Sequence, residues 1–433
     1  MLIYLPNHTN RSKYIFDKIF AGEFGISYTT TNKKTEFENY TGEKINYSDN
    51  KLNNEFFIRA SPLLAENSIR ETSMALSQKY GTIVLFASDI CDLGFDIFSA
   101  VFYMLSRYEE YLPNTPDQYG RFEAKNSIAF KNDFLQRPVV DEWINILKSF
   151  LQQKFPAIPF KKSQFNAIVT YDIDVAYKFK GRNAARNIAS VLKDAAGFNF
   201  KNLKERNNVF KKASGDPWDT YDYLQEKIAQ HKLNSIFFFL LGDKSKHDRN
   251  IAYRHPLMQQ LIKKIAGFSE VGIHPSFYSS SSREKIISEK QRLENLSGRT
   301  ITKSRQHFLK FKLPGTYNDL IKAGIRQDYS MGFPYQCGFR AGTCKPFRFY
   351  DLENEVQTEL DIFPITMMEG NFMHEKKFDK TSIITRILNL LKEVKKVEGT
   401  FISIWHNHTV SETDEFSDLR DIHEQMLQAI SNI

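Results

Sequence analysis

Two aspartates, Asp172 and Asp174, follow a short apolar run and are the residues of this chain best spaced to do chemistry together. The run Ala167, Ile168, Val169 is too short for a helix and too apolar for a sheet edge, which predicts a buried strand. Residues two apart on an extended chain point to the same side, so both carboxylates should project from the strand's carboxyl end. Parallel α/β folds place their chemistry there. The alternative is a structural Asp-rich turn.

Further ligand-type side chains occur where other apolar runs end, namely Asp243, His274, His307, His406 and His408. If these runs are parallel strands, their loops bring the side chains together at one rim. One aspartate and two histidines around a divalent ion, with a position left for water, form a hydrolytic metal site. A second aspartate beside that site can accept a proton from the water. The pattern therefore predicts metal-assisted hydrolysis, with packing or loop capping as the alternative for each histidine.

The elements that must position these residues alternate between strand and helix after a Pro-containing linker at Phe155–Phe160. The predicted strands are Ser235–Leu241, Glu270–His274, Arg305–Leu309, Glu359–Phe363 and Thr400–Trp405. Such alternation is typical of a mainly parallel sheet with right-handed crossovers. We expect residues 1–160 to form a smaller, separate α/β domain of unknown role. We find no residues in it whose types and spacing are typical of a catalytic site.

Four motifs carry a resemblance to a known family, and they are Thr170–Asp174, Gly272–Ser276, Gly338–Gly342 and Ile404–His408. Their order resembles that of polysaccharide deacetylases of the NodB-homology type, carbohydrate esterase family 4. The resemblance covers residues 161–433 and is nearest to a bacterial branch with an additional N-terminal domain. Segments ending at Tyr111 and Phe122 resemble the N-terminal signature of that branch. The resemblance implies a distorted (β/α)7 barrel that hydrolyses an N- or O-acetyl group on a sugar.

The resemblance also implies roles for individual residues. Asp172 matches the general base and Asp174 the metal-binding aspartate. His274 matches the first metal-binding histidine, and Arg340 matches the arginine that orients the base. Either histidine of the final motif, His406 or His408, matches the residue that protonates the leaving group.

The chain departs from the family pattern at three places. Ile173 separates two aspartates that are usually adjacent, and Tyr278 occupies the position of the usual second metal-binding histidine. The usually proline-rich arginine motif reads Arg-Ala-Gly-Thr. His307, at the end of a neighbouring strand, is our candidate for the third metal ligand.

Charge is unevenly distributed along the 433 residues, whose net charge is +8. An insertion at about residues 178–214 contains ten Lys and Arg residues against Asp194 and Glu205. No nucleic-acid-binding motif accompanies it. A peripheral contact with an anionic membrane surface is one interpretation, and a solvated helical face is the other.

Cys91, Cys337 and Cys344 lack metal-type spacing, and their odd number argues against a disulfide framework. The N-terminus lacks the basic and long apolar regions of a signal peptide, so a cytoplasmic protein is expected.

The function that the resemblance implies is removal of an acetyl group from a sugar of a cell-surface glycan or its precursor, with Zn²⁺ as the expected metal. A non-catalytic glycan-binding protein on a decayed deacetylase scaffold is the alternative. Hydrolysis of a non-sugar amide on the same fold also stays open. The sequence predicts no oligomeric state.

Overall fold

Strand β7 (Asn166–Ile173), the apolar run that precedes Asp174, lies within the largest sheet of the computed structural model. The structure describes residues 1–182, 184–373 and 378–433. In these residues the sheet has nine strands in the order β12-β13-β11-β10-β9-β8-β7-β15-β14. All neighbours pair in parallel except β12 and β13, which are antiparallel. The predicted mixed α/β class with a mainly parallel sheet is therefore confirmed.

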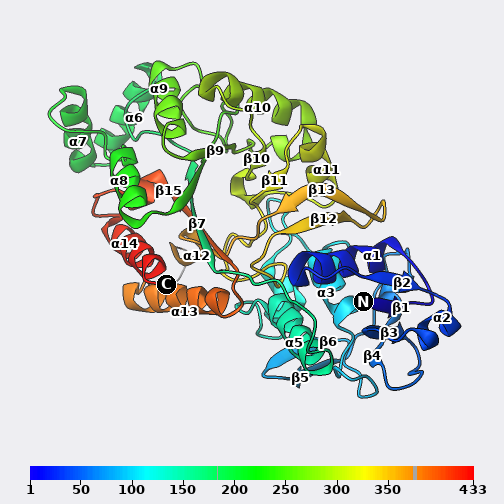
Figure 1. The fold of residues 1–433 in the computed structure, drawn as a ribbon. Helices are drawn as coiled ribbons and strands as arrows, with labels where there is room; N and C mark the ends of the chain where they lie inside the picture. The colour runs from blue at the N-terminus through cyan, green and yellow to red at the C-terminus, as the bar shows by residue number, and fades with distance from the viewer. Residues whose placement is uncertain (183, 374–377) are drawn as a thin grey trace.

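The strands of this sheet vary greatly in length. Besides β7 they are β8 (Asn234–Phe239), β9 (Glu270–Ile273), β10 (Lys303–Ser304), β11 (Gln327–Asp328), β12 (Phe347–Asp351), β13 (Val356–Ile362), β14 (Met367–Met368) and β15 (Thr400–His406). The helices that follow them are α8 (Tyr221–His231), α9 (Pro256–Ala266), α10 (Arg283–Ser297), α11 (Gly315–Lys322), α12 (Gly370–Met373), α13 (Lys380–Lys396) and α14 (Ser417–Ser431). Figure 1 shows these helices around the sheet.

The predicted strand at Arg305–Leu309 is wrong. Strand β10 ends at Ser304, and His307–Leu309 form a 3-10 turn. Phe308 and Leu309 have φ values of 62° and 50°, and two successive residues in this left-handed conformation end an extended strand. The chain therefore turns at His307 instead of continuing past it.

The two ends of the sheet approach each other through the segment between β13 and β14. The N–H of Ile365 donates to the carbonyl of Met331 at 3.0 Å, and the N–H of Thr366 donates to that of Ile402 at 2.8 Å. A small buried cluster joins apolar side chains from strands across the sheet, including Phe238, Tyr329, Ile365, Ile402 and Ile404. The pairings among the described residues still give an open strand order, so a closed (β/α)7 barrel stays a prediction.

Residues before the linker form a second parallel sheet, in the order β2-β1-β3-β4, and a β5–β6 hairpin. The strands are β1 (Leu2–Tyr4), β2 (Thr29–Thr31), β3 (Lys44–Ser48), β4 (Phe56–Arg59), β5 (Leu76–Lys79) and β6 (Thr82–Leu85). The helices are α1 (Asn10–Phe16), a π-helical segment (Asp17–Phe24), α2 (Lys34–Asn39), α3 (Ile97–Leu105), α4 (Ile128–Lys131) and α5 (Val139–Lys154).

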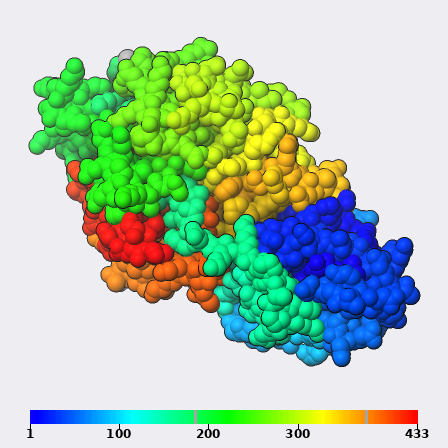
Figure 2. Space-filling view, in the orientation of Figure 1, coloured from blue at the N-terminus to red at the C-terminus, as the bar shows by residue number. Residues whose placement is uncertain are grey.

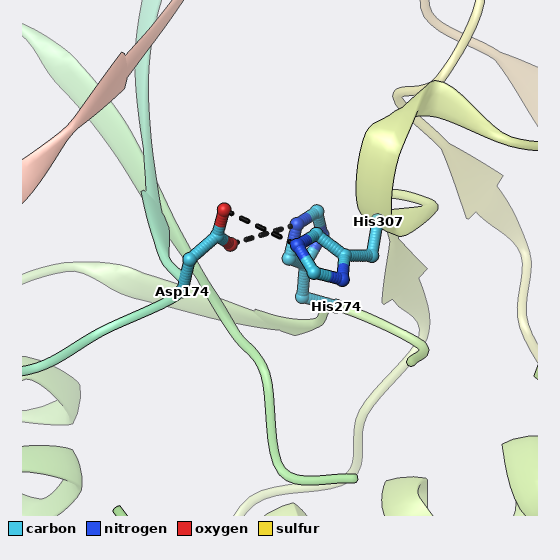
Figure 3. Close-up of side chains that lie close together, drawn as sticks. All are labelled: Asp174, His274 and His307. Carbon is cyan, nitrogen blue, oxygen red and sulfur yellow. Dashed lines mark ion pairs between the residues drawn. The ribbon is translucent and has the colours of Figure 1, made fainter. Parts of the chain in front are cut away.

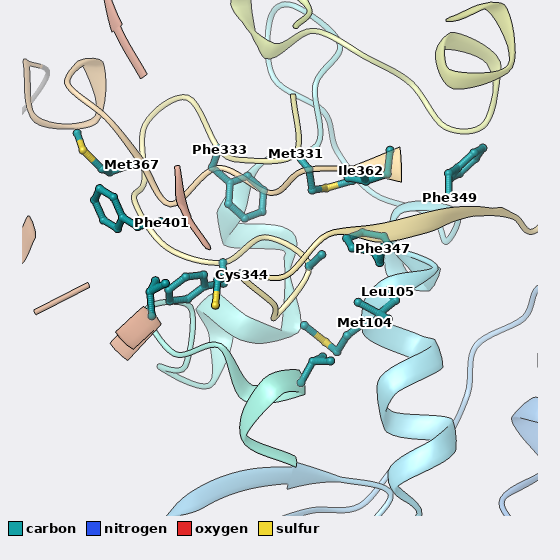
Figure 4. Close-up of a cluster of buried hydrophobic side chains, with 14 of the residues drawn as sticks. Met104, Leu105, Met331, Phe333, Cys344, Phe347, Phe349, Ile362, Met367 and Phe401 are labelled. Carbon is teal, nitrogen blue, oxygen red and sulfur yellow. The ribbon is translucent and has the colours of Figure 1, made fainter. Parts of the chain in front are cut away.

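One apolar core runs from this N-terminal region into the larger sheet. Figure 4 shows the junction, where Met104 and Leu105 of α3 lie among side chains such as Phe347 and Ile362. The division into domains at residue 160 stays a prediction, because the packing continues across it.

A buried ion-pair cluster also crosses the junction. Arg107 pairs with Glu109 and Glu110. Arg340 joins it by two hydrogen bonds to Glu110, at 2.9 and 2.6 Å. Burial raises the pKa of Glu110, but the two arginines outweigh that effect and hold the pKa below its usual value. The carboxylate therefore stays charged and binds both regions together.

The basic insertion contains two helices, α6 (Ala184–Ala196) and α7 (Phe200–Phe210), which extend from one end of the molecule. Asn183 in this insertion lies outside the described residues. Among the residues that the structure describes, no helix is both long and apolar enough to cross a membrane.

Candidate metal centre

Three imidazole rings present their Nε2 atoms to one carboxylate, that of Asp174. The Nε2 of His274 lies 3.2 Å from Oδ1, and the Nε2 atoms of His307 and His406 lie 3.3 and 3.4 Å from Oδ2. Figure 3 shows Asp174, His274 and His307 converging from separate elements. The ligand atoms of these three residues all lie within 4.8 Å of one another. The structure thus brings together the aspartate and the two histidines predicted as metal ligands, and adds His406.

The parallel sheet explains why these residues meet. Asp174 follows β7, His274 follows β9, His307 lies in the turn after β10, and His406 ends β15. Strand β15 pairs with β7 so that His406 is opposite Asp172. Because the carboxyl ends of parallel strands share one edge, four segments distant in sequence deliver their side chains to one point.

Each of the three rings uses its Nδ1–H to donate to an oxygen and so directs Nε2 toward Asp174. The acceptors are the main-chain oxygen of Arg305 for His274 at 2.5 Å, Asp248 for His307 at 2.9 Å, and Glu369 for His406 at 2.5 Å. This arrangement fixes both ring orientation and tautomer, as at histidine-ligated metal sites.

The donor set suits a divalent ion. An imidazole ring that carries its only proton on Nδ1 presents a lone pair at Nε2. The Nε2 of His274 faces Oδ1 of Asp174. Among the described residues that buried oxygen has no hydrogen-bond partner. Two acceptors facing each other in a buried site repel unless a cation lies between them. Imidazole nitrogens with a carboxylate oxygen are ligands typical of Zn²⁺ and similar ions.

The groups around the site shift one another's protonation. Burial raises the pKa of Asp174, but the three histidines outweigh burial and hold the pKa well below its usual value. Burial lowers the pKa of His307, but Asp174 and Asp248 together raise it to about 9. Without a metal, His307 is therefore charged at neutral pH, and a proton occupies the position that a cation would take.

The second predicted carboxylate, Asp172, lies beside this centre and is bound by an arginine that sequence reasoning missed. Its Oδ2 is 3.8 Å from the Nε2 of His274. Arg305 donates from Nη1 to Oδ1 of Asp172 at 2.9 Å and to the hydroxyl of Thr170 at 2.6 Å. Arg305 is fully buried, and its Nε donates to the carbonyl of Tyr329. Asp172 is thus held in one orientation, facing the histidines.

The assignment of Arg340 as the residue that orients Asp172 is wrong. Arg340 is buried at the junction with the N-terminal region, where it pairs with Glu110 and donates to the carbonyl of Gly332. The physical reason lies in the glycines of its motif. A Cβ on Gly338 would lie 2.4 Å from the Leu135 carbonyl oxygen, so the motif packs closely against the N-terminal region.

Two other strand-end residues have different surroundings. His408 lies 5.5 Å from His406, ring to ring, and 5.0 Å from Trp218. Burial, reinforced by the charge on His406, lowers the pKa of His408 to about 4, so it is neutral at pH 7. Asp243 is not at the centre, because it is exposed and pairs with Arg292.

A cleft of about 910 Å³ opens onto the centre. Its walls include Trp218, Phe308, Tyr335 and, from the N-terminal region, Tyr119 and Arg121. Arg121 donates to the Phe308 carbonyl at 2.6 Å and to the Tyr335 hydroxyl at 3.2 Å, and the Tyr119 ring lies 5.3 Å from that of Phe308. The N-terminal region therefore holds the left-handed turn that directly follows His307.

Sequence reasoning missed Arg305, Asp248 and Glu369. A signal existed for Arg305, a charged residue two positions before His307 and next to a short strand. Asp248 and Glu369 lie outside the predicted strands, so no strand pattern marks them.

Comparison with known proteins gives limited matches. A family model described as a family of unknown function, DUF7033, matches residues 1–156. The chain matches no curated protein. Similar solved structures include a proposed polysaccharide deacetylase from Mycobacterium smegmatis, at 12% identity and a TM-score of 0.40, covering 62% of this chain and 85% of that chain.

Two Bacillus structures are also similar. A polysaccharide deacetylase from Bacillus cereus matches at 11% identity and a TM-score of 0.32, covering 63% of this chain and 88% of that chain. A family 4 carbohydrate esterase pseudoenzyme from Bacillus anthracis matches at 9% identity and a TM-score of 0.29, covering 61% and 62%. Similarities at these identities and TM-scores assign no function to this chain.

The charged state of His307 predicts that metal affinity depends on pH. Below a pKa of about 9 the ring is protonated, and a metal must displace that proton. We expect the zinc affinity of the metal-free protein to rise about tenfold per pH unit between about pH 6 and 8 for one displaced proton. Calorimetric titration with zinc in buffers of different ionisation enthalpy measures both the affinity and the proton release. An affinity that stays constant over this range would contradict the assignment.

Proposed function

We propose that this protein is a divalent-metal-dependent hydrolase that removes an acetyl group from a sugar of a cell-surface glycan or its precursor. The observation that carries this proposal is the position of Asp172, a carboxylate held by Arg305 beside a His/His/Asp centre on the wall of an open cleft. The substrate class rests on the order of the four motifs, which resembles that of polysaccharide deacetylases. On the same grounds we propose that residues 161–433 form a deacetylase barrel of carbohydrate esterase family 4.

The proposed roles follow from position and charge. Asp174, His274 and His307 would hold the ion, with Zn²⁺ the expected one. When bound, such an ion activates water and polarises a carbonyl. Asp172 accepts a proton from the attacking water, because its second oxygen faces the centre while Arg305 fixes the first.

Of the two candidate proton donors, His406 fits the role better than His408. Burial lowers the pKa of His406, but Glu369 and Asp174 outweigh it and raise the pKa well above its usual value. A protonated ring can give its proton to a departing amine or alkoxide, whereas His408 is neutral at pH 7. Because the Nε2 of His406 also faces Asp174, the competing role is that of a further metal ligand.

The cleft suits a carbohydrate. Trp218, Tyr119 and Tyr335 offer aromatic surface beside the centre, and aromatic faces pack against the apolar faces of sugar rings. Arg121 and Lys246 add hydrogen-bond donors to the same cleft. A non-catalytic glycan-binding protein would use the same walls, and the experiment below separates the two functions.

Asp172→Asn tests the base. The substitution keeps the shape and removes the proton acceptor, so acetate release from an acetylated oligosaccharide should fall about 10²–10⁴-fold with zinc content unchanged. Asp174→Asn should instead weaken zinc binding, with activity partly restored by excess zinc. Asp243→Asn, an exposed carboxylate outside the centre, is the matched control and should change neither quantity.

Full acetate release by Asp172→Asn would exclude this residue as the base. If the zinc-loaded wild type binds the oligosaccharides but releases no acetate from any of them, the binding-protein alternative replaces the proposed function.

His406→Gln separates proton donation from metal ligation. If His406 donates the proton, the variant should retain zinc and lose about 10²–10⁴-fold in turnover. Glu369→Gln removes the charge that stabilises the protonated ring, so the alkaline limb of the pH–rate profile should move to lower pH. His408→Gln serves as the comparison and should change turnover less. Loss of zinc from His406→Gln would identify a metal ligand instead.

A further inference from the structure

The basic insertion exposes an apolar surface. In α6, Ile188, Val191, Leu192 and Ala195 are exposed and spaced at i, i+3, i+4 and i+7, so they share one face of the helix. A helix normally buries such a face against the core. Leu192 is 65% exposed.

Two phenylalanines after α6, at the connection to α7 and at its start, are exposed as well. Phe198 and Phe200 are 77% and 67% exposed, and their rings lie 6.3 Å apart. Together with Ile188, Val191 and Leu192 they form what we call the apolar ridge. Large apolar side chains gathered on one exposed surface indicate an interaction site.

The insertion also carries several exposed lysines. Lys193, Lys204, Lys211 and Lys212 are exposed on the same two helices and the turn that follows. The two acidic residues of the insertion are already neutralised by basic partners: Glu205 pairs with Lys178, and Asp194 with Arg206. Lys201, beside Phe200, pairs with Asp414 from outside the insertion. The four exposed lysines named above therefore give the two helices an excess of positive charge.

Helices with exposed apolar side chains and exposed lysines match an anionic lipid surface. Such helices lie in the interfacial layer, with apolar side chains among the acyl chains and lysines near the headgroups. A protein partner would also cover apolar side chains, but nothing in that alternative requires the excess of lysine. Charge complementarity thus favours a membrane surface.

The position of the insertion connects this surface with the cleft. Val175 and Trp218, which flank the insertion in sequence, both line the cleft. The two helices project from the end of the molecule, away from the N-terminal region (Figures 1 and 2). The insertion therefore begins and ends within a few residues of the cleft wall.

We propose that the apolar ridge and its lysines bind the protein to the surface of an anionic membrane. This inference goes beyond the proposed function and does not depend on catalysis. In the bound state, the apolar side chains are buried among the acyl chains, and the lysines are attracted to the anionic headgroups.

Vesicle sedimentation tests the proposal. The full-length protein is mixed with vesicles of phosphatidylcholine alone or with about 30% phosphatidylglycerol, at low and high salt. We expect binding to the anionic vesicles, weakened several-fold by high salt because the lysine contribution is screened.

Two variants and a control separate the contributions. The triple variant Leu192→Ser, Phe198→Ser, Phe200→Ser should bind anionic vesicles at least about tenfold more weakly. The variant Lys193→Gln, Lys204→Gln, Lys211→Gln should lose most of the salt dependence. Ile90→Ser with Ile287→Ser, two exposed isoleucines elsewhere, should bind like the wild type. Unchanged thermal melting shows that each variant is folded.

Several results would overturn the proposal. They are absence of wild-type binding to either vesicle, equal binding to neutral and anionic vesicles, or wild-type binding by the apolar triple variant. A wild-type dimer in solution that the triple variant converts to a monomer would show that a second copy of the chain covers the ridge instead.

Discussion

A partly buried carboxylate facing three imidazole nitrogens is the interaction on which the rest of this structure depends. Asp174 directly follows β7, and its charge needs compensation because its Oδ1 is shielded from water. A proton on His307 supplies that compensation in the metal-free protein. A divalent ion would also compensate the charge of Asp174, and the imidazole and carboxylate groups around it are ligands that such an ion binds. The same geometry thus explains both the protonation of the site and its fit to a metal.

The surrounding shell is built to keep that geometry rigid. Asp248 and Glu369 each accept a hydrogen bond from the Nδ1 of one histidine. Arg305 accepts one from His274 through its main-chain oxygen and donates one to Asp172 through its side chain. One arginine therefore connects the proposed base with a ligand of the proposed metal. Such coupling makes the site a single unit in which loss of one partner disturbs the others.

The N-terminal region belongs to this unit through two contacts. Arg121 holds the carbonyl of Phe308, next to His307, and Arg340 anchors the larger sheet to Glu110. Because the core is continuous across the linker, the region that matches a family of unknown function shapes the cleft wall instead of lying apart from it.

Sequence patterns predicted the centre better than its surroundings. Asp172, Asp174 and His274 follow apolar strands, and the shared edge of a parallel sheet was enough to group them. His307 was placed correctly although the strand assigned to it is a turn, because the strand just before it still ends at the same edge.

Long-range packing explains the failures. Arg340 was assigned to the site from its motif, yet the glycines of that motif fit against the N-terminal region, which no local pattern reveals. Strands β11 and β14 have two residues each, too few for any periodicity. The insertion was recognised by its charge alone, since exposure of Leu192 and Phe198 depends on which face of the helices meets the body.

The most direct test of the account is an anomalous-scattering experiment on crystals of the protein grown with zinc. The account predicts one strong peak at the zinc edge, about 2.0–2.2 Å from a carboxylate oxygen of Asp174 and from the Nε2 atoms of His274 and His307. The position of His406 relative to that peak would assign its role at the same time. A crystal without a peak at this point, in which the three Nε2 atoms still face Asp174 alone, would contradict the central claim.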